Sequence, residues 1–417
     1  MKRPGPTARV MIGLIAGAVI GLALAQFAPE AGARAAAIAK PIGKLWLSGL
    51  QMTVVPLVLA LVILGVASAS DAAASGRVAR RALLTFAILL CGFSAYSAIC
   101  APLLLSLVPH SQALADTLQS ANAVSNVALP SLSDWITQII PSNAIMATAQ
   151  GAMLPVVVFA LFFGFALMKI DSERRNQILG LCQGLADTMI VIVHGMLLVA
   201  PIGVFALVLV VCTEAGVSVI GALASYIVLL IVLYLGATLA CYPIVWLAGH
   251  ESPLRFAKAV LPAQVVAAST QSSLATLPAM IESAEARLGY RRNVVALVLP
   301  MAVTLFRITS PVQYMAAASF IAWAYGIELS SVQLAAAAAL AVVISLGAIG
   351  LPGQVSFMAT VMPVTTSLGL PVEPLGLLLA VDPVPDVFAT IGNATGDVTA
   401  TSLVAQREGD PPATSNG

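Results

Sequence analysis

Ten apolar stretches dominate the pattern of hydrophobic and polar positions along this chain. They lie at residues 10–28, 41–69, 82–108, 152–168, 177–213, 217–248, 254–283, 293–325, 332–368 and 375–405. About 20 consecutive apolar residues are enough for a helix to cross a bilayer. The pattern therefore predicts an all-α polytopic membrane protein, and the interruptions inside the stretches decide how many of them cross.

Two stretches are interrupted near their middle by clusters of Ser, Thr, Gly and Pro. The stretch at 254–283 contains Ser272 and Ser273, and the stretch at 332–368 contains Gly350 and Pro352. Such clusters mark turns, and a broken backbone at membrane depth must be satisfied by protein or water. We interpret both stretches as re-entrant helical hairpins, which leaves eight transmembrane helices.

The last stretch carries polar side chains at helical spacing. Asp382, Asp386, Thr390, Asn393 and Asp397 follow one another at intervals of four, four, three and four residues, so on one helix they form a single stripe. Charged residues at membrane depth are costly and usually mark an ion or substrate route. For Asp382 alone, a structural pairing with a cation of a neighbouring helix is the alternative.

Composition supports the membrane class and excludes others. Of the 417 residues 60% are hydrophobic and 9% are charged, with a mean hydropathy of +1.00, whereas soluble domains carry roughly a quarter charged residues. A net charge of +1 gives no support to a nucleic-acid partner. Since no nucleophile and base, and no metal-type cluster, accompany the acids, an enzyme is not predicted.

The basic residues sort to one side of the predicted topology. With eight crossings and two hairpins, fifteen of the 19 Lys and Arg residues face the cytoplasm, Arg34, Lys40 and Lys44 face outside, and Arg307 lies in the membrane. The positive-inside rule then places both termini in the cytoplasm. The stretch at 10–28 could pass for a signal peptide, but this topology needs it as the first helix. Residues 407–417 are predicted to be a disordered tail.

A weak internal repeat relates the two hairpins. Each interrupted stretch is followed by a crossing with polar residues at its middle, and the two units enter the membrane from opposite sides. Inverted repeats with broken helices and a midplane site are typical of secondary transporters. Asp187 and His194, in the fifth stretch, are interpreted as polar residues in helix contacts and are assigned no role.

Four short motifs carry a resemblance to a known family. They are SSLATLP at 272–278, LPMAVT at 299–304, SLGAIGLPG at 345–353 and NATGD at 393–397. In these motifs and in topology the chain resembles the dicarboxylate/amino acid:cation symporters. The resemblance implies an elevator-type homotrimer in the cell inner membrane. Residues 1–250 would be mainly scaffold, with the third and sixth crossings joining the transport core of residues 251–406.

The resemblance also implies residue roles. It places Asp386 at the substrate ammonium, Thr390 and Asn393 at the polar ends of the substrate, and Asp397 at a sodium ion, to which Asn393 is also assigned. The two hairpin tips would close on the substrate from opposite sides. The tip residues concerned are Ser272 and Ser273 in the first hairpin and Gly350, Leu351, Pro352 and Gly353 in the second.

Two departures from the family pattern change the expected chemistry. Ala389 stands where members that carry acidic substrates have an arginine, which favours a neutral substrate. Arg307 stands in the seventh crossing, where the family motif Asn-Met-Asp-Gly-Thr is replaced by residues 306–310, FRITS. Because its guanidinium essentially never deprotonates, Arg307 is incompatible with several sodium ions in one cavity.

Three interpretations of Arg307 stay open. It replaces a bound cation, it forms a structural ion pair, or it clamps an acidic substrate side chain. Asp382 is a candidate proton site, because a buried carboxyl group near another one holds protons more tightly. The sequence thus predicts a symporter of a small amino acid or dicarboxylate with altered sodium coupling, using sodium or a proton and no enzymatic cofactor. The alternatives are sodium-independent or proton-coupled exchange of neutral amino acids, and an anion conductance.

Overall fold

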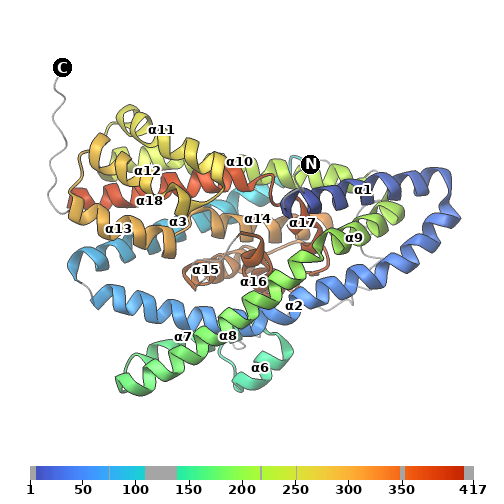
Figure 1. Cartoon of the computed structure of the whole chain (residues 1–417), viewed down its shortest axis with the longest axis horizontal. Helices are drawn as coiled ribbons and strands as arrows, with labels where there is room; N and C mark the ends of the chain where they lie inside the picture. Colours follow the sequence, from blue (N-terminus) through green and yellow to red (C-terminus); the bar gives the residue numbers. More distant parts are fainter. Residues whose placement is uncertain are drawn as a thin grey trace.

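The computed structural model describes residues 6–74, 76–108, 139–216, 218–249, 251–347 and 353–407, and these form helices with no strand (Figure 1). The first half of the chain contains α1 (Pro6–Phe27), α2 (Pro29–Ala74), α3 (Arg77–Leu105), α6 (Ala144–Gln150), α7 (Met153–Leu167), α8 (Ser172–Leu198), α9 (Ala200–Ala215) and α10 (Ser218–Gly249). The predicted all-helical class is confirmed for the described residues.

Close helix packing organises the first half. Helix α1 lies along α9 and leaves no room for side chains at its glycines, since a Cβ on Gly13 would lie 2.4 Å from the carbonyl oxygen of Pro201. Small residues allow such approach between membrane helices. Helix α2 continues through Pro41 and Pro56 over 46 residues, longer than the predicted stretch at 41–69.

Helix length and composition give a coarser count than the eight predicted crossings. Among the described residues six helices are long and apolar enough to cross a membrane, or seven if α17 and α18 count as one bent crossing. The fourth predicted crossing is the 15-residue α7, and the fifth is divided into α8 and α9 at Val199. A proline explains the division between α8 and α9. Pro201 lies at the start of α9, and the residue before a proline disfavours the helical conformation.

Both interrupted stretches consist of two helices. The first hairpin contains α11 (Pro253–Thr270) and α12 (Ser273–Glu282), followed by the π-helical turn η1 (Ser283–Arg287). It breaks at Gln271, whose φ of 50° is left-handed. The second contains α15 (Ser331–Gly347) and α16 (Gly353–Ser367), and its predicted tip residues Gly350, Leu351 and Pro352 lie outside the described residues. So does the predicted disordered tail beyond Arg407.

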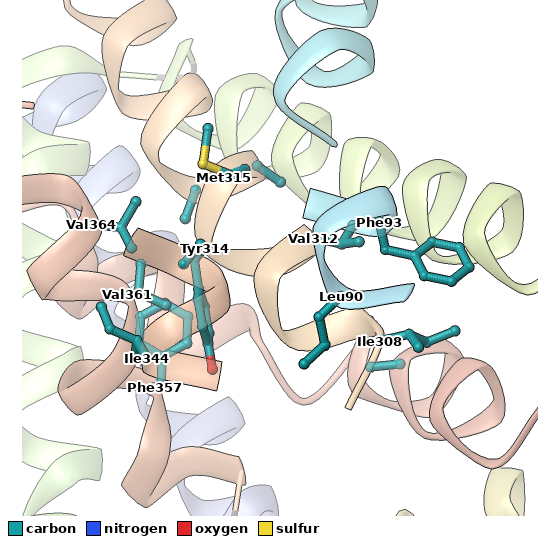
Figure 2. Packing of buried hydrophobic residues seen from close by; sticks show 14 of the residues in the cluster. Leu90, Phe93, Ile308, Val312, Tyr314, Met315, Ile344, Phe357, Val361 and Val364 are labelled. Carbon is teal, nitrogen blue, oxygen red and sulfur yellow. The ribbon is translucent and has the colours of Figure 1, made fainter. Parts of the chain in front are cut away.

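The seventh crossing is broken where the sequence departs from the family motif. Helix α13 (Arg292–Leu305) ends before Phe306, and α14 (Thr309–Ala324) begins three residues later. Phe306 stacks on Phe86 of α3 with ring centroids 4.8 Å apart. Figure 2 shows the buried side chains that hold the beginning of α14 between α3 and the second hairpin.

The eighth crossing is bent, which corrects the prediction of one continuous stripe. Helix α17 (Leu375–Val381) and α18 (Asp386–Arg407) meet at an angle of 77°. Pro383 and Pro385 lie in the bend, where a proline removes a backbone donor and opposes regular helix. Asp382 therefore belongs to the bend, and the stripe on α18 contains Asp386, Thr390, Asn393 and Asp397.

Helix α18 packs so closely on the break of the seventh crossing that Gly396→Ala should destabilise the protein. The new Cβ would lie 2.9 Å from the Cδ1 atom of Ile308, and overpacking of this kind costs about 1–3 kcal/mol. Gly221→Ala in α10 is the control, because no heavy atom lies within 4 Å of its Cβ position. Thermal unfolding in detergent should show a lower melting temperature for Gly396→Ala only. Equal melting temperatures would contradict the packing argument.

Candidate functional site

The polar stripe of α18 is buried inside the protein. Helices α10, α11, α13 and α3 surround α18 (Figure 1). Thr390, Asn393 and Asp397 are 5%, 6% and 1% exposed, and Asp382 in the bend is 4% exposed. The predicted polar residues therefore face protein rather than lipid, as a functional or paired site requires.

The broken seventh crossing docks directly on this stripe. The backbone N–H of Thr309 donates to Oδ1 of Asn393 at 3.1 Å, and Oγ1 of Thr309 donates to the carbonyl oxygen of Ala389 at 3.4 Å. The first N–H groups of a helix have no partner inside the helix, so Asn393 satisfies one of them for α14. The side chain of Asn393 thus holds the helix break in place.

Arg307 lies at this break, in the residues between α13 and α14. It is half-buried, and it is the cation that attracts the carboxylates of both Asp386 and Asp397. The two acids are eleven residues apart on α18, which is about 16 Å along the helix axis. The charge of one guanidinium therefore acts on two carboxylates near opposite ends of the stripe, at least one of them from a distance.

Asp397 is the least satisfied acid of the site. Within the described part of the chain, neither of its carboxylate oxygens has a hydrogen-bond partner, although the residue is 1% exposed. Burying an ionised carboxylate without hydrogen bonds is strongly unfavourable. Its neighbourhood therefore favours a bound proton or a bound cation, beyond the attraction of Arg307.

Asp382 has a partner that the sequence analysis missed. Nε2 of Gln313 in α14 donates a hydrogen bond to Oδ1 of Asp382. The sequence contained an indication of this contact, because the polar amide of Gln313 lies inside the apolar stretch at 293–325. A second such amide, Gln264 of α11, donates to Oγ1 of Thr395 at 2.9 Å and so ties the first hairpin to α18.

The other predicted residues are placed as follows. Both helices of the first hairpin contact α18. Oγ of Ser272 accepts from the backbone N–H of Ala275 and caps α12, Ser273 is buried, and Oγ1 of Thr390 donates to the carbonyl oxygen of Asp386 within α18. Gly353 begins α16. The structure thus places Arg307 at the break that docks on Asn393, with Asp386 and Asp397 on the same stripe of α18, while the hydroxyl groups of Ser272 and Thr390 form hydrogen bonds within their own segments.

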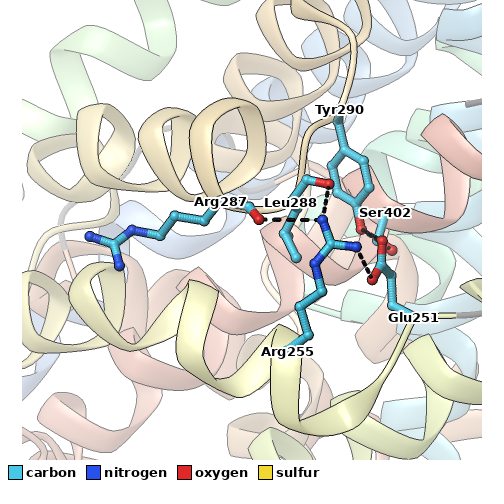
Figure 3. A network of polar contacts seen from close by, with 6 residues as sticks. All are labelled: Glu251, Arg255, Arg287, Leu288, Tyr290 and Ser402. Atoms are coloured by element: carbon cyan, nitrogen blue, oxygen red, sulfur yellow. Dashed lines mark hydrogen bonds and ion pairs between the residues drawn. The ribbon is translucent and has the colours of Figure 1, made fainter. Parts of the chain in front are cut away.

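A separate polar network lies at the base of the first hairpin, away from its tip (Figure 3). The carboxylate of Glu251, which is 2% exposed, accepts from Arg255 at 3.3 Å and from the Tyr290 hydroxyl at 3.4 Å. Arg255 also donates to the carbonyl oxygen of Leu288 at 3.0 Å, and the hydroxyl of Tyr290, whose one hydrogen goes to Glu251, accepts from the hydroxyl of Ser402 at 2.7 Å. The network joins α11, the start of α13 and the end of α18.

Glu251 should make the stability of this region depend on pH. Burial raises the pKa of its carboxyl group above the usual 4.5, and Arg255 and the Tyr290 hydroxyl offset this only in part. The folded protein therefore binds this proton more tightly than the unfolded chain, so the free energy of unfolding falls as pH rises through the interval between the two pKa values. Glu251→Gln should flatten this dependence of the melting temperature on pH. In the control Glu282→Gln, which changes an exposed ion pair with Arg287, the slope should stay; identical slopes in both variants would contradict the assignment.

The sequence of this chain is similar to those of known transporters. The sequence model of the sodium:dicarboxylate symporter family matches residues 7–407. The chain is 30% identical to the proton/glutamate-aspartate symporter of Escherichia coli K12, over 88% of this chain and 85% of that protein. It is 28% identical to the proton/sodium-glutamate symport protein of Bacillus caldotenax, over 98% and 96%, and 30% identical to the C4-dicarboxylate transport protein of Cupriavidus necator, over 93% and 89%.

Proposed function

Because this chain belongs to the sodium:dicarboxylate symporter family, we propose that it carries a small amino acid or dicarboxylate across the inner membrane with altered sodium coupling. It is a multi-pass membrane symporter and not an enzyme, and the resemblance drawn from its sequence motifs is confirmed. The proposal of altered sodium coupling rests on Arg307. This fixed cation lies at the break between α13 and α14, and its charge acts on both Asp386 and Asp397 in α18.

Asp386 and Ala389 support a substrate with a free ammonium group. Asp386 is half-buried one turn before Thr390, where its carboxylate can accept charge-assisted hydrogen bonds from an ammonium. Ala389 offers no cation for an acidic side chain, which favours a neutral amino acid. The relatives, by contrast, are named for glutamate, aspartate and C4-dicarboxylates, so Arg307 is the residue of this chain that could bind a second carboxylate.

The ion chemistry follows from the fixed charge. The fixed charge of Arg307 acts on Asp397 and supplies positive charge that a bound cation would otherwise supply, so it reduces the number of ions needed for charge balance. The carboxylate oxygens of Asp397 have no hydrogen-bond partner in the described chain, so they can bind one sodium ion or one proton. Asp382, hydrogen-bonded to Gln313 and close to Asp386, is the second proposed proton carrier.

The remaining features of the proposal come from the family resemblance. They are eight crossings and two re-entrant hairpins with both termini in the cytoplasm, a scaffold built mainly from residues 1–250, a moving transport core of residues 251–406, and a homotrimer. The substrate would lie between the tips of the hairpins, near Ser272, Ser273 and residues 350–353. The contacts of α11 and α12 with α18 support that arrangement.

An anion conductance is the second candidate function, because a cavity lies between the two halves of the chain. Its volume is about 430 Å³, and it is lined by α2 and α9 on one side and by α14 and α17 on the other. Lys40, Lys44, Ser48 and Gln51 line it from α2 at helical spacing. Glu214 and Glu373 line the same cavity, and Lys40 forms an ion pair with Glu214 at 3.8 Å, so the lining offers an anion no net positive charge and this candidate rests on the size and position of the cavity.

Uptake into proteoliposomes tests these proposals. Amino acids and dicarboxylates are offered with sodium, potassium and proton gradients imposed separately. Accumulation that follows the proton gradient or substrate exchange, and ignores sodium, is the expected result for a guanidinium that replaces the ion. Sodium-driven accumulation would mean that Arg307 only tunes a sodium site at Asp397. Anion current without accumulation of any substrate would favour the conductance.

A further inference from the structure

A basic pocket lies at the base of the first hairpin. Its volume is about 380 Å³, and the described residues that line it are Ser252, Leu254, Arg255, Lys258, Ala259 and Arg287. Three of these side chains are cationic and none is acidic. Lys258 belongs to the second turn of α11 and Arg287 ends η1, so the pocket lies where the two ends of the hairpin meet.

Two carboxylates pair with the arginines of the pocket, but neither of them lines it. Glu251 holds Arg255 in place from the buried side at 3.3 Å (Figure 3). Glu282 lies 3.5 Å from Arg287, and both of these side chains are exposed, so this ion pair contributes little and can be exchanged for another anion. Lys258 forms no ion pair within the described part of the chain. The cations of Lys258 and Arg287 are therefore available to a ligand.

The start of α11 adds hydrogen-bond donors to the same pocket. The N-cap residue Ser252 makes no capping hydrogen bond with its side chain, and Pro253 follows it. The first backbone bond of the helix runs from Phe256 to Ser252 at 2.9 Å, so the N–H groups of Leu254 and Arg255 have no partner inside the helix. Such a helix start carries a partial positive charge and favours an anion, in addition to the charge of the side chains.

An exposed apolar stripe continues from the pocket along α11. Leu254, Leu261 and Val265 are 65%, 56% and 60% exposed. Together with Lys258 they follow one another at intervals of four, three and four residues, so they share one face of the helix. Lipid tails cover such side chains, and a lysine near the end of a membrane helix reaches toward the headgroups. A cationic pocket that continues into an apolar stripe matches a ligand with an anionic head and an acyl chain.

We propose that this pocket binds the headgroup of an anionic phospholipid, with an acyl chain lying along Leu261 and Val265. In the predicted topology the base of the first hairpin faces the cytoplasm. The cytoplasmic leaflet is the anionic one, and basic pockets between membrane helices on that side suit such headgroups. A lipid bound there joins α11 to η1, both of which contact α18. It therefore holds the base of the hairpin against the helix that carries the polar stripe.

Titration of the purified full-length protein in detergent tests the ligand. The probes are phosphatidylglycerol, phosphatidylcholine with the same acyl chains, and inorganic phosphate, and the melting temperature is recorded because a ligand of the folded state raises it. Phosphatidylglycerol should raise the melting temperature, and the other two probes should raise it much less. An equal rise with phosphatidylcholine, or no rise with any probe, would overturn the anionic lipid site. An equal rise with inorganic phosphate would show a free phosphate as the occupant and overturn the lipid.

Single substitutions test the place of binding. Lys258→Gln and Arg287→Gln each remove one cation of the pocket, so each should weaken the apparent affinity for phosphatidylglycerol by about fivefold. Arg174→Gln is the matched control, because it removes an exposed cation near the start of α8, on the same predicted side of the membrane, and it should keep the affinity. Equal affinities in all three variants would overturn the pocket as the site. Since the measurement records lipid binding and no uptake, its outcome is independent of the proposed transport function.

Discussion

Arg307→Met should give a protein whose uptake depends on sodium. The variant removes a fixed positive charge that favours the ionised carboxylates of Asp386 and Asp397, and Asp397 is 1% exposed with no hydrogen-bond partner for its oxygens in the described chain. A sodium ion bound by the carboxylate oxygens of Asp397 can supply the positive charge that Arg307 no longer provides. In sodium-free buffer we expect uptake to be lost, and with added sodium we expect both uptake and thermal stability to recover.

Arg307→Lys is the matched control, because it keeps the charge while losing the planar guanidinium. It should keep sodium-independent uptake at a reduced rate. If Arg307→Met instead aggregates in sodium and in sodium-free buffer alike, Arg307 is a structural ion-pair partner. If the variant is stable and loses only acidic substrates, Arg307 binds the substrate carboxylate.

Asp386→Asn should strongly weaken the recognition of amino acids. Asparagine keeps the size of the side chain but removes the charge that an ammonium would meet. Truncating one partner of a buried charge pair costs 2 kcal/mol or more, so the apparent affinity for amino acids should fall by at least about 30-fold. The measurement is the substrate dependence of uptake in proteoliposomes, with the neutral amino acid that the unaltered protein carries best.

Two comparisons make this prediction specific. Asp382→Asn changes the proposed proton carrier of the same region, and because an amide oxygen can still accept from Gln313, it should change the dependence of uptake on the proton gradient and lower amino acid affinity much less than Asp386→Asn does. Dicarboxylates have no ammonium, so any uptake of them should survive Asp386→Asn. Equal losses in both variants would show that Asp386 contributes general charge balance and does not contact the substrate.

The sequence by itself determined the class of the protein and the places where its helices break. Apolar runs of membrane length, few charges and clusters of Ser, Gly and Pro are local properties, and they predicted the helical membrane protein and the break at Gln271–Ser272. The family motifs are local as well, and the family that they indicated is confirmed. The bend between α17 and α18 was also encoded locally, by Pro383 and Pro385, although its 77° angle removed Asp382 from the expected stripe.

Only the tertiary structure decided which polar groups meet. Asn393 is bound to the backbone of Thr309 from 84 residues away, and Gln264 is bound to Thr395 from 131 residues away. No spacing within one helix specifies such contacts, because they depend on how the broken seventh crossing and the first hairpin pack on α18. The same packing docks the break that carries Arg307 on α18, where the charge of Arg307 acts on Asp386 and Asp397.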